Sequence, residues 1–225
     1  MTIKIPKRGG FGIHDFKTVW MTYVGCFYGN LQSEMTNIKN ETIQNNQPKT
    51  CSRLCGNEPY FALQKDSCLC FKDNIKNKLT EIKENRCHEK CLPLNQDYFN
   101  CGSQDSYSVY RRDSEFRIEE KEDCLTISID KIQSTLQAKS CDQKYQSLCK
   151  TKQGMIITNE ESGFYRAKLR CENNLGRLMI PNETMPRDAV KGRIYWIGTF
   201  RQNKSRQTSN GTAAATSRPL NPSMY

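Results

Sequence analysis

Short apolar runs separated by polar stretches mark the first half of the chain and predict short strands. Residues 60–63 and residues 67–71 are two such runs, and a polar Gln-Lys-Asp triplet separates them. The second run carries cysteines at alternate positions, which a strand places on one face. Residues 18–27 and 107–111 predict edge elements of the same unit.

Cysteine pairs spaced four residues apart predict two short helices in this region. Cys51 and Cys55 would share a helical face, because positions i and i+4 lie on the same side. The same spacing recurs at Cys87 and Cys91. Thr50 is the expected N-cap of the first helix. The first region is therefore expected to be a small α+β unit in which a helical cysteine pair faces a strand pair.

Strand patterns also recur in the second half of the chain. Residues 124–129 alternate between apolar and polar positions, and residues 145–149 and 194–198 form further strand-like runs. A charged, Glu-rich stretch over residues 111–123 is interpreted as a linker. Residues 202–225 are rich in Ser, Thr, Asn and Ala, which predicts a disordered tail.

One amphipathic helix is expected in the second half. Thr158 and Glu161 have the spacing of a capping box, in which each side chain bonds the other's backbone amide. Apolar positions at 164, 167 and 171 then fall on one helical face. Gly176 is the expected end of this helix.

Composition indicates that disulfides, rather than a large apolar core, stabilise the chain. Its 225 residues allow one or two domains, yet only 36% are apolar and the mean hydropathy is −0.77. It contains 12 cysteines, an even number. Such usage is typical of proteins that fold in an oxidising compartment. No run of about 18 apolar residues occurs, so no membrane span is predicted.

The positive charge lies outside the densest cysteine region. The whole chain carries a net charge of +10, whereas residues 23–110 hold ten basic and ten acidic side chains. The excess comes from residues 1–22, with +3, and residues 111–225, with +7. Basic residues alternate with acidic ones, so we expect an ordinary solvated surface and no nucleic-acid partner.

The same composition argues against a metal site, a cofactor and catalysis. His14 and His88 are the two histidines, too few for a multi-histidine site. Zinc is the competing use of the cysteines, but their C-x₃-C and C-x-C spacings differ from the C-x₂-C pairs that zinc sites favour. Nucleotide-binding and hydrolase motifs do not occur in the sequence. An even cysteine count also leaves no thiol nucleophile, so we expect no enzyme.

An extracellular or cell-surface location is expected from the cysteines, although no signal peptide is visible. Residues 1–20 are polar and basic and lack an apolar segment. We infer an incomplete chain or an internal piece of a larger extracellular protein, with cytosolic residence as the alternative. Four N-x-[ST] sequons could carry glycans, at Asn40, Asn182, Asn203 and Asn210.

An ordered set of motifs over about 90 residues, 21–112, carries a family resemblance. The motifs are Tyr23-Val-Gly-Cys-Phe27, Cys51-x₃-Cys55, Tyr60-Phe-Ala-Leu63, Cys68-Leu-Cys70, Cys87-x₃-Cys91, Asn100-Cys-Gly-Ser103 and Tyr107-Ser-Val-Tyr110. This order resembles the WSC domain. One departure is Phe71, which follows Cys70 where the family usually has glycine.

The resemblance to the WSC domain implies a disulfide pairing and a function. The implied bonds are Cys26–Cys87, Cys51–Cys68, Cys55–Cys70 and Cys91–Cys101. The implied function is carbohydrate binding, in which aromatic faces stack on sugars. Tyr28 and Tyr98 border polar loops and are the preferred ligand-binding candidates, followed by Tyr60 and Tyr107.

The second region resembles pieces of the C-type lectin-like domain in permuted order. Cys124-x₁₆-Cys141-x₇-Cys149 is similar to the family's C-terminal part. Residues 165–171, 176–178 and 195–198 are similar to its N-terminal part. Either one domain ends and another begins here, or a single domain is permuted and reduced. The family pairing implies the bonds Cys124–Cys141 and Cys149–Cys171.

The calcium ligands of the sugar-binding lectins are not matched. Where that family has a W-N-D triplet, this chain has Leu136-Gln-Ala138. Calcium needs six to eight oxygen ligands, and neither Leu136 nor Ala138 supplies one from its side chain. We therefore expect no calcium site.

The sequence thus predicts an α+β fold: a disulfide-rich WSC-type module with short helices on a small antiparallel sheet, plus a partial C-type lectin-like α+β region. Its expected parts are a leader, the WSC-like domain, a linker with the lectin-like C-terminal part, the lectin-like N-terminal part and a tail. Their ranges are 1–20, 21–112, 113–152, 153–201 and 202–225. The leading functional hypothesis is a non-catalytic module that binds polysaccharide or glycoprotein glycans. The alternative is a structural or protein-interaction ectodomain of a receptor that binds no sugar.

Overall fold

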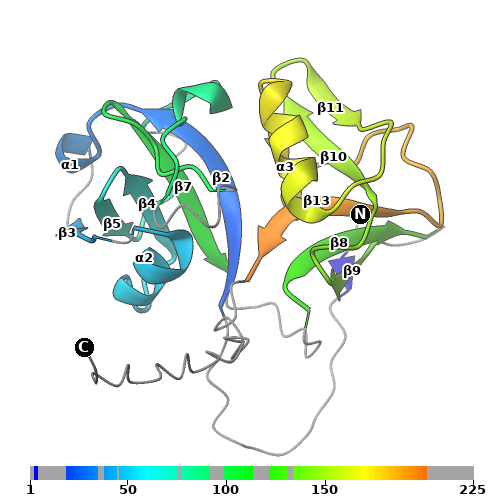
Figure 1. Ribbon diagram of the computed structural model, residues 1–225, viewed down its shortest axis with the longest axis horizontal. Coiled ribbons are helices and arrows are strands. Elements are labelled where there is room, and N and C mark those ends of the chain that lie inside the picture. The colour runs from blue at the N-terminus through cyan, green and yellow to red at the C-terminus, as the bar shows by residue number, and fades with distance from the viewer. Residues whose placement is uncertain are drawn as a thin grey trace, which may run out of the picture.

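Strands are the main secondary structure of the described chain, and the helices are few and short. The computed structural model describes residues 3–4, 19–34, 38–44, 46–75, 78–91, 99–113, 122–130 and 134–201. Its main sheet runs through both halves in the order β1-β9-β8-β13-β2-β7-β4-β5-β3 (Figure 1). The expected α+β fold is therefore wrong. Pairing between strands that are distant in sequence organises the chain, and most of these pairs are antiparallel.

The first half forms an antiparallel block around β7 (Ser106–Asp113). β2 (Trp20–Tyr28) pairs with one edge of β7, and β4 (Tyr60–Gln64) pairs with the other. β5 (Ser67–Phe71) and β3 (Lys39–Thr42) continue the sheet beyond β4. Because β7 extends to residue 113, the start of the expected linker belongs to a strand; residues 114–121 lie outside the described part of the chain.

Helix α2 (Pro48–Leu54) covers one face of this block. It buries Cys51 completely and follows Gln47, not Thr50 as predicted. Proline at the first helical position lacks only an amide that would have no partner in the helix, so Pro48 starts the helix earlier than a threonine cap would.

The helix predicted over residues 87–91 does not form. A single 3₁₀ turn, η2 (Glu84–Arg86), ends before it, and the chain then runs as an irregular segment. The amide of Cys91 donates to the carbonyl of Phe99 at 3.1 Å. Pairing with the segment at residues 99–102 thus replaces the expected helical hydrogen bonds. Two small elements complete this half, α1 (Leu31–Glu34) and β6 (Thr80–Ile82), the latter paired with β2.

The second half begins with a strand meander. β8 (Cys124–Ile129) and β9 (Ser134–Lys139) pair antiparallel, and β1 (Ile3–Lys4) lies parallel to β9. β10 (Gln146–Thr151) and β11 (Gly154–Ile157) form a hairpin. The expected domain boundary at residues 152–153 falls in the turn of this hairpin.

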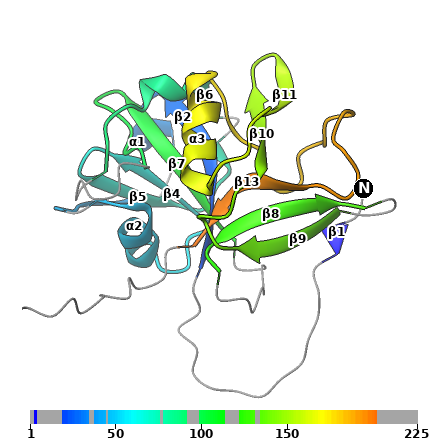
Figure 2. The same cartoon turned by 45° about the vertical axis from the view of Figure 1, so that its right-hand side comes forward.

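Helix α3 (Phe164–Asn173) lies against β10 and β13 (Figure 2). After the helix, β12 (Arg177–Leu178) pairs antiparallel with β10. β13 (Ile194–Phe200) is the last strand described. In the part of the chain that the structure describes, no helix is long and apolar enough to cross a membrane.

β13 joins the two halves, because it pairs with β8 on one side and with β2 on the other. Thr199 lies opposite Thr22, and their hydroxyl oxygens are 2.8 Å apart in a buried hydrogen bond. Tyr195 lies opposite Ile127 on the other side. Two regions that the sequence treats separately therefore share one sheet (Figures 1 and 2).

The main hydrophobic cluster crosses this junction. It unites Tyr23 and Tyr110 of the first half with Phe164 of the second. Phe200 stacks on Phe99 with ring centroids 4.7 Å apart and both rings buried, so aromatic packing helps to close the junction. A second cluster lies among β8, β9, β10 and β13, and a third lies on the opposite face of the first-half sheet.

All twelve cysteines form disulfides, which confirms the expected disulfide-bonded chain. Four bonds lie in the first half and two in the second. The pairs coincide with those that the resemblances imply: Cys26–Cys87, Cys51–Cys68, Cys55–Cys70, Cys91–Cys101, Cys124–Cys141 and Cys149–Cys171.

Candidate functional site

The tyrosines expected to bind ligand do not gather at one place. Tyr28 is 56% exposed at the end of β2, whereas Tyr107 is only 6% exposed in β7. Phe27 lies opposite Tyr107, so Tyr28, the next residue, points to the other face of the sheet. Tyr98 lies outside the described residues.

Tyr60 shares a face with Tyr107 but serves as part of the core. It lies opposite Arg111, which is on the same face of β7 as Tyr107. Its ring stacks on the buried Phe71, with centroids 5.8 Å apart and planes 6° apart. The described tyrosines therefore form no common platform on which a sugar could stack.

A groove in the second half offers a better candidate. It has a volume of about 600 Å³, within the range of about 300–1,000 Å³ typical of small-molecule sites. It lies between the β10–β11 hairpin and the loop after β12, which is orange in Figure 1. Its lining residues are Lys150, Met155, Asn182, Glu183, Thr184, Met185, Pro186, Arg187 and Asp188.

Close backbone packing brings the two walls of the groove together. Arg177 of β12 lies opposite Lys150 of β10. Gly176 comes so near to β10 that a Cβ there would lie 2.4 Å from the carbonyl oxygen of Lys150. Only glycine fits this approach, and it lets the chain after α3 run back along the hairpin.

A buried ion pair anchors the loop wall. The Arg177 guanidinium donates to both carboxylate oxygens of Glu183, at 2.7 and 3.1 Å, and its side chain is 4% exposed. The amide of Ile180 donates to the same carboxylate at 2.9 Å. Burial tends to lower the pKa of Arg177, but the hydrogen bonds and charge of Glu183 raise it above its usual value. The loop is thus fixed before any ligand arrives.

The groove presents several polar side chains that the fold does not use. Lys150, Arg187 and Asp188 are exposed, and their side chains make no hydrogen bond or ion pair within the described ranges. Met155 and Met185 are half-buried and add apolar surface. Donors, an acceptor and apolar surface side by side suit a ligand that carries hydroxyl groups on an aliphatic ring.

The sequons lie in different settings. Asn182, at the groove, is exposed and has a positive φ of 76°, a conformation that asparagine tolerates better than most residues. Asn40 is exposed on strand β3. Asn203 and Asn210 lie outside the described residues.

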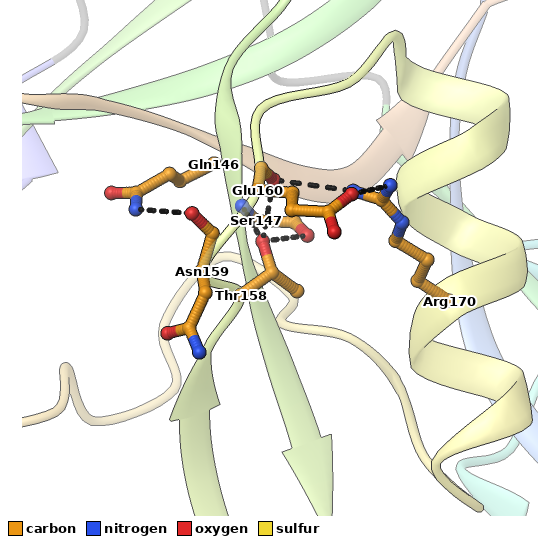
Figure 3. Close-up of polar contacts among 6 residues, drawn as sticks. All are labelled: Gln146, Ser147, Thr158, Asn159, Glu160 and Arg170. Carbon is orange, nitrogen blue, oxygen red and sulfur yellow. Dashed lines mark hydrogen bonds and ion pairs between the residues drawn. The ribbon is translucent and has the colours of Figure 1, made fainter.

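The predicted capping box at Thr158 does not cap the helix. Helix α3 begins at Phe164, and its N-cap is Gly163. The Thr158 hydroxyl instead accepts a hydrogen bond from the amide of Ser147 at 2.8 Å (Figure 3). A contact with a strand eleven residues away thus outcompetes the local cap.

Residues around Thr158 form a polar network at the base of the hairpin (Figure 3). Gln146 donates to the carbonyl of Asn159 at 3.5 Å, and Arg170 of α3 pairs with the carboxylate of Glu160. The Glu160 side chain is 74% exposed, so this pair adds little stability. The network holds the β11–α3 connection in place, and we assign it a structural role.

A buried set of ionisable groups lies where the two halves meet. Tyr23 of β2 donates a hydrogen bond to the carboxyl group of Glu84 in η2. Lys168 and Glu172 of α3 form an ion pair that is 5% and 9% exposed. The Lys168 ammonium lies over the ring of Tyr23, 5.7 Å from its centroid. These four residues are called the buried joint below.

Burial changes the protonation of the buried joint. Desolvation raises the pKa of Glu84 to about 8, although the hydrogen bond from Tyr23 works in the opposite direction. Burial and the nearby Glu84 charge raise the pKa of Tyr23 well above its ordinary value. Glu84 is therefore protonated in the folded protein at neutral pH. Because these side chains are enclosed between β2, η2 and α3, the joint couples the two halves and is a poor candidate for ligand binding.

Two positions considered for metals have other structural roles. The sulfur atoms of Cys51, Cys55 and Cys68 lie within 4.8 Å of one another, but all three belong to disulfides and offer no thiolate to zinc. Leu136 and Ala138 lie in β9 with their side chains in the hydrophobic core.

The sequence patterns did not predict the groove. They give no role to Lys150, Arg187 or Asp188. The one available signal was a sequon enclosed by Pro181 and Pro186, which marks a constrained surface loop. Comparison with protein-family models and with curated proteins gives no match for this chain.

Proposed function

We propose that the protein is an extracellular, non-catalytic carbohydrate-binding module whose saccharide site is the groove of the second half. The observation that carries the proposal is the cluster of unused polar side chains at Lys150, Arg187 and Asp188 in a groove of about 600 Å³. The six disulfides are consistent with an extracellular location.

The chemistry of the groove supports saccharide binding. Sugar hydroxyl groups both donate and accept hydrogen bonds, which the two cations and Asp188 can complement. Met155 and Met185 can contact the C–H face of a ring. The resemblances to the WSC and C-type lectin-like domains favour the same class of ligand. The site belongs to the second half, however, and not to the aromatic residues of the first.

A glycan array probed with oxidised protein tests this proposal. The protein should be made in an oxidising bacterial compartment, so that it folds with disulfides but carries no glycan of its own. The array should show selective binding. The double variant Arg187→Ala/Asp188→Ala should bind the parent protein's preferred glycan at least about tenfold more weakly, because hydrogen bonds to charged groups are lost.

A matched variant separates the groove from general charge effects. Lys72→Ala/Asp73→Ala also removes one exposed cation and one neighbouring carboxylate, but in the first half. It should retain binding. If the folded protein binds no glycan, or if both variants lose binding equally, the groove is not a saccharide site.

The alternative is a protein-interaction ectodomain that binds no sugar. Tyr28 favours it, because an exposed tyrosine of this kind is typical of protein contacts. In that case, a captured partner would remain bound after its glycans are removed, and Tyr28→Ser would release it.

A further inference from the structure

The groove carries its own glycan acceptor. Asn182, Glu183 and Thr184 form a sequon, and all three residues line the groove. Modification would join Nδ2 of Asn182 to the anomeric carbon of an oligosaccharide. The carrier lipid diphosphate would leave, and the amide nitrogen would lose one proton. The first sugars would then lie next to the groove-lining side chains.

The shape of the loop holds this acceptor in place. The ion pair between Glu183 and Arg177 fixes the middle residue of the sequon. Asn182 has a positive φ, so its side chain leaves a tight turn rather than an extended strand. The attachment point is therefore fixed relative to Lys150, Arg187 and Asp188.

We propose that the glycan on Asn182 folds back into the groove, which then holds the protein's own saccharide. This inference rests on the proposed saccharide binding by the groove. A short covalent link gives an effective concentration in the millimolar range. A site with a dissociation constant of about 0.1 mM would thus be occupied roughly nine-tenths of the time. External saccharide would bind mainly to molecules that lack this glycan.

The chain contains a matched control for this proposal. Asn40-Glu41-Thr42 has the same three residues as the groove sequon. It lies in the extended strand β3, where Asn40 and Thr42 are exposed and Lys39 pairs with Glu41 at the surface. No residue of β3 lines the groove, so a glycan on Asn40 would not be attached beside it.

Protection from an endoglycosidase measures whether the glycan is held. The protein should be secreted from eukaryotic cells and digested in its native state with an enzyme that cleaves between the first two N-acetylglucosamine residues. Site-resolved mass spectrometry then gives one rate for Asn40 and one for Asn182. We expect cleavage at Asn182 to be about tenfold slower, matching the occupancy above.

Two further measurements test whether the groove causes the slower cleavage at Asn182. The two rates should become equal after reduction and denaturation, and in native Arg187→Ala/Asp188→Ala, but not in native Lys72→Ala/Asp73→Ala. Equal rates in the native parent protein, or modification of Asn40 without Asn182, would overturn the inference.

The inference and the proposed function fail in different ways. Array binding by the unglycosylated protein without protection at Asn182 overturns only the inference. Protection without array binding supports a groove that holds its own glycan and removes the role as a receptor for external glycans. If neither is found, both proposals are wrong.

Discussion

Helices α2 and α3 cover the two halves of the sheet in different ways. Helix α2 has seven residues, and the residues it buries are Pro48, Cys51 and Ser52. Disulfides from Cys51 and Cys55 hold it to β5. The ten-residue helix α3 is tied to β10 by a single disulfide and buries apolar residues in the shared aromatic cluster. Crosslinks therefore replace apolar contacts where the covering helix is too short to supply them.

Removing the aromatic contact between the halves should lower the free energy of unfolding more than any other change considered below, its matched control excepted. Phe200→Ala deletes a ring that is 1% exposed and stacks on Phe99 across the junction. We expect a loss of about 3–5 kcal/mol in the free energy of unfolding. The two halves should also unfold in separate steps, which calorimetry with the disulfides intact would detect.

Phe71→Ala is the matched control for Phe200→Ala. Phe71 is also 1% exposed, but it belongs to the cluster within the first half. Its removal should cost a similar free energy and leave a single cooperative transition. Two transitions in both variants would mean that the junction has no special role in coupling the halves.

Deleting one disulfide from each half sharpens the comparison further. Cys51–Cys68 and Cys124–Cys141 both close a loop with a sequence separation of 17. Loss of either crosslink should cost about 3 kcal/mol from chain entropy alone. Removing the first by double alanine substitution should cost more, because α2 has few other contacts.

Hydrogen exchange locates the damage in these two variants. Loss of Cys51–Cys68 should expose the amides of α2, whereas loss of Cys124–Cys141 should leave α3 protected. Equal losses of stability, with equal exchange in both helices, would contradict the view that the first half depends more on its crosslinks than the second.

Counted per pH unit, the smallest change is a pH dependence that arises at the buried joint. In the unfolded chain, Glu84 ionises near its ordinary pKa of 4.5, whereas the folded protein keeps it protonated up to about pH 8. Between these values only the unfolded state loses the proton, so the free energy of unfolding falls as pH rises. The slope should reach about 1.4 kcal/mol per pH unit and flatten outside this window.

Glu84→Gln tests this assignment. Glutamine can still accept the hydrogen bond from Tyr23 but does not ionise, so the variant should lose that part of the slope in denaturant titrations between pH 5 and pH 8. Glu160→Gln, which changes a carboxylate that is 74% exposed, should retain it. An unchanged slope in Glu84→Gln would show that the joint does not bind this proton.

Local patterns in the sequence predicted strands that each pair with a neighbour in sequence, β4 with β5 and β8 with β9. The alternation over residues 124–129 corresponds to β8, and the runs at residues 60–63 and 67–71 correspond to β4 and β5. The disulfide pairs were implied by a family resemblance, which rested on the order of the cysteines and the spacing between them.

Features that depend on distant partners could not be predicted. Thr158 has the right neighbour for a capping box, but β10 uses its hydroxyl. Glu84 stands in a polar, charged stretch that is typical of a solvated surface, yet the packing of α3 buries it. The groove likewise depends on the pairing of β12 with β10. A strand of only two residues has too little pattern to predict this pairing.

The central place of β13 has a consequence for how the chain is made. β2 ends at Tyr28, and the strand that completes its edge begins only at Ile194. At about 5–20 residues per second, a ribosome would need on the order of ten seconds or more to add the missing partner. Throughout that interval the Met21–Thr22 end of β2 lacks its partner strand on this edge, so chaperones would have their greatest influence before the final strand emerges.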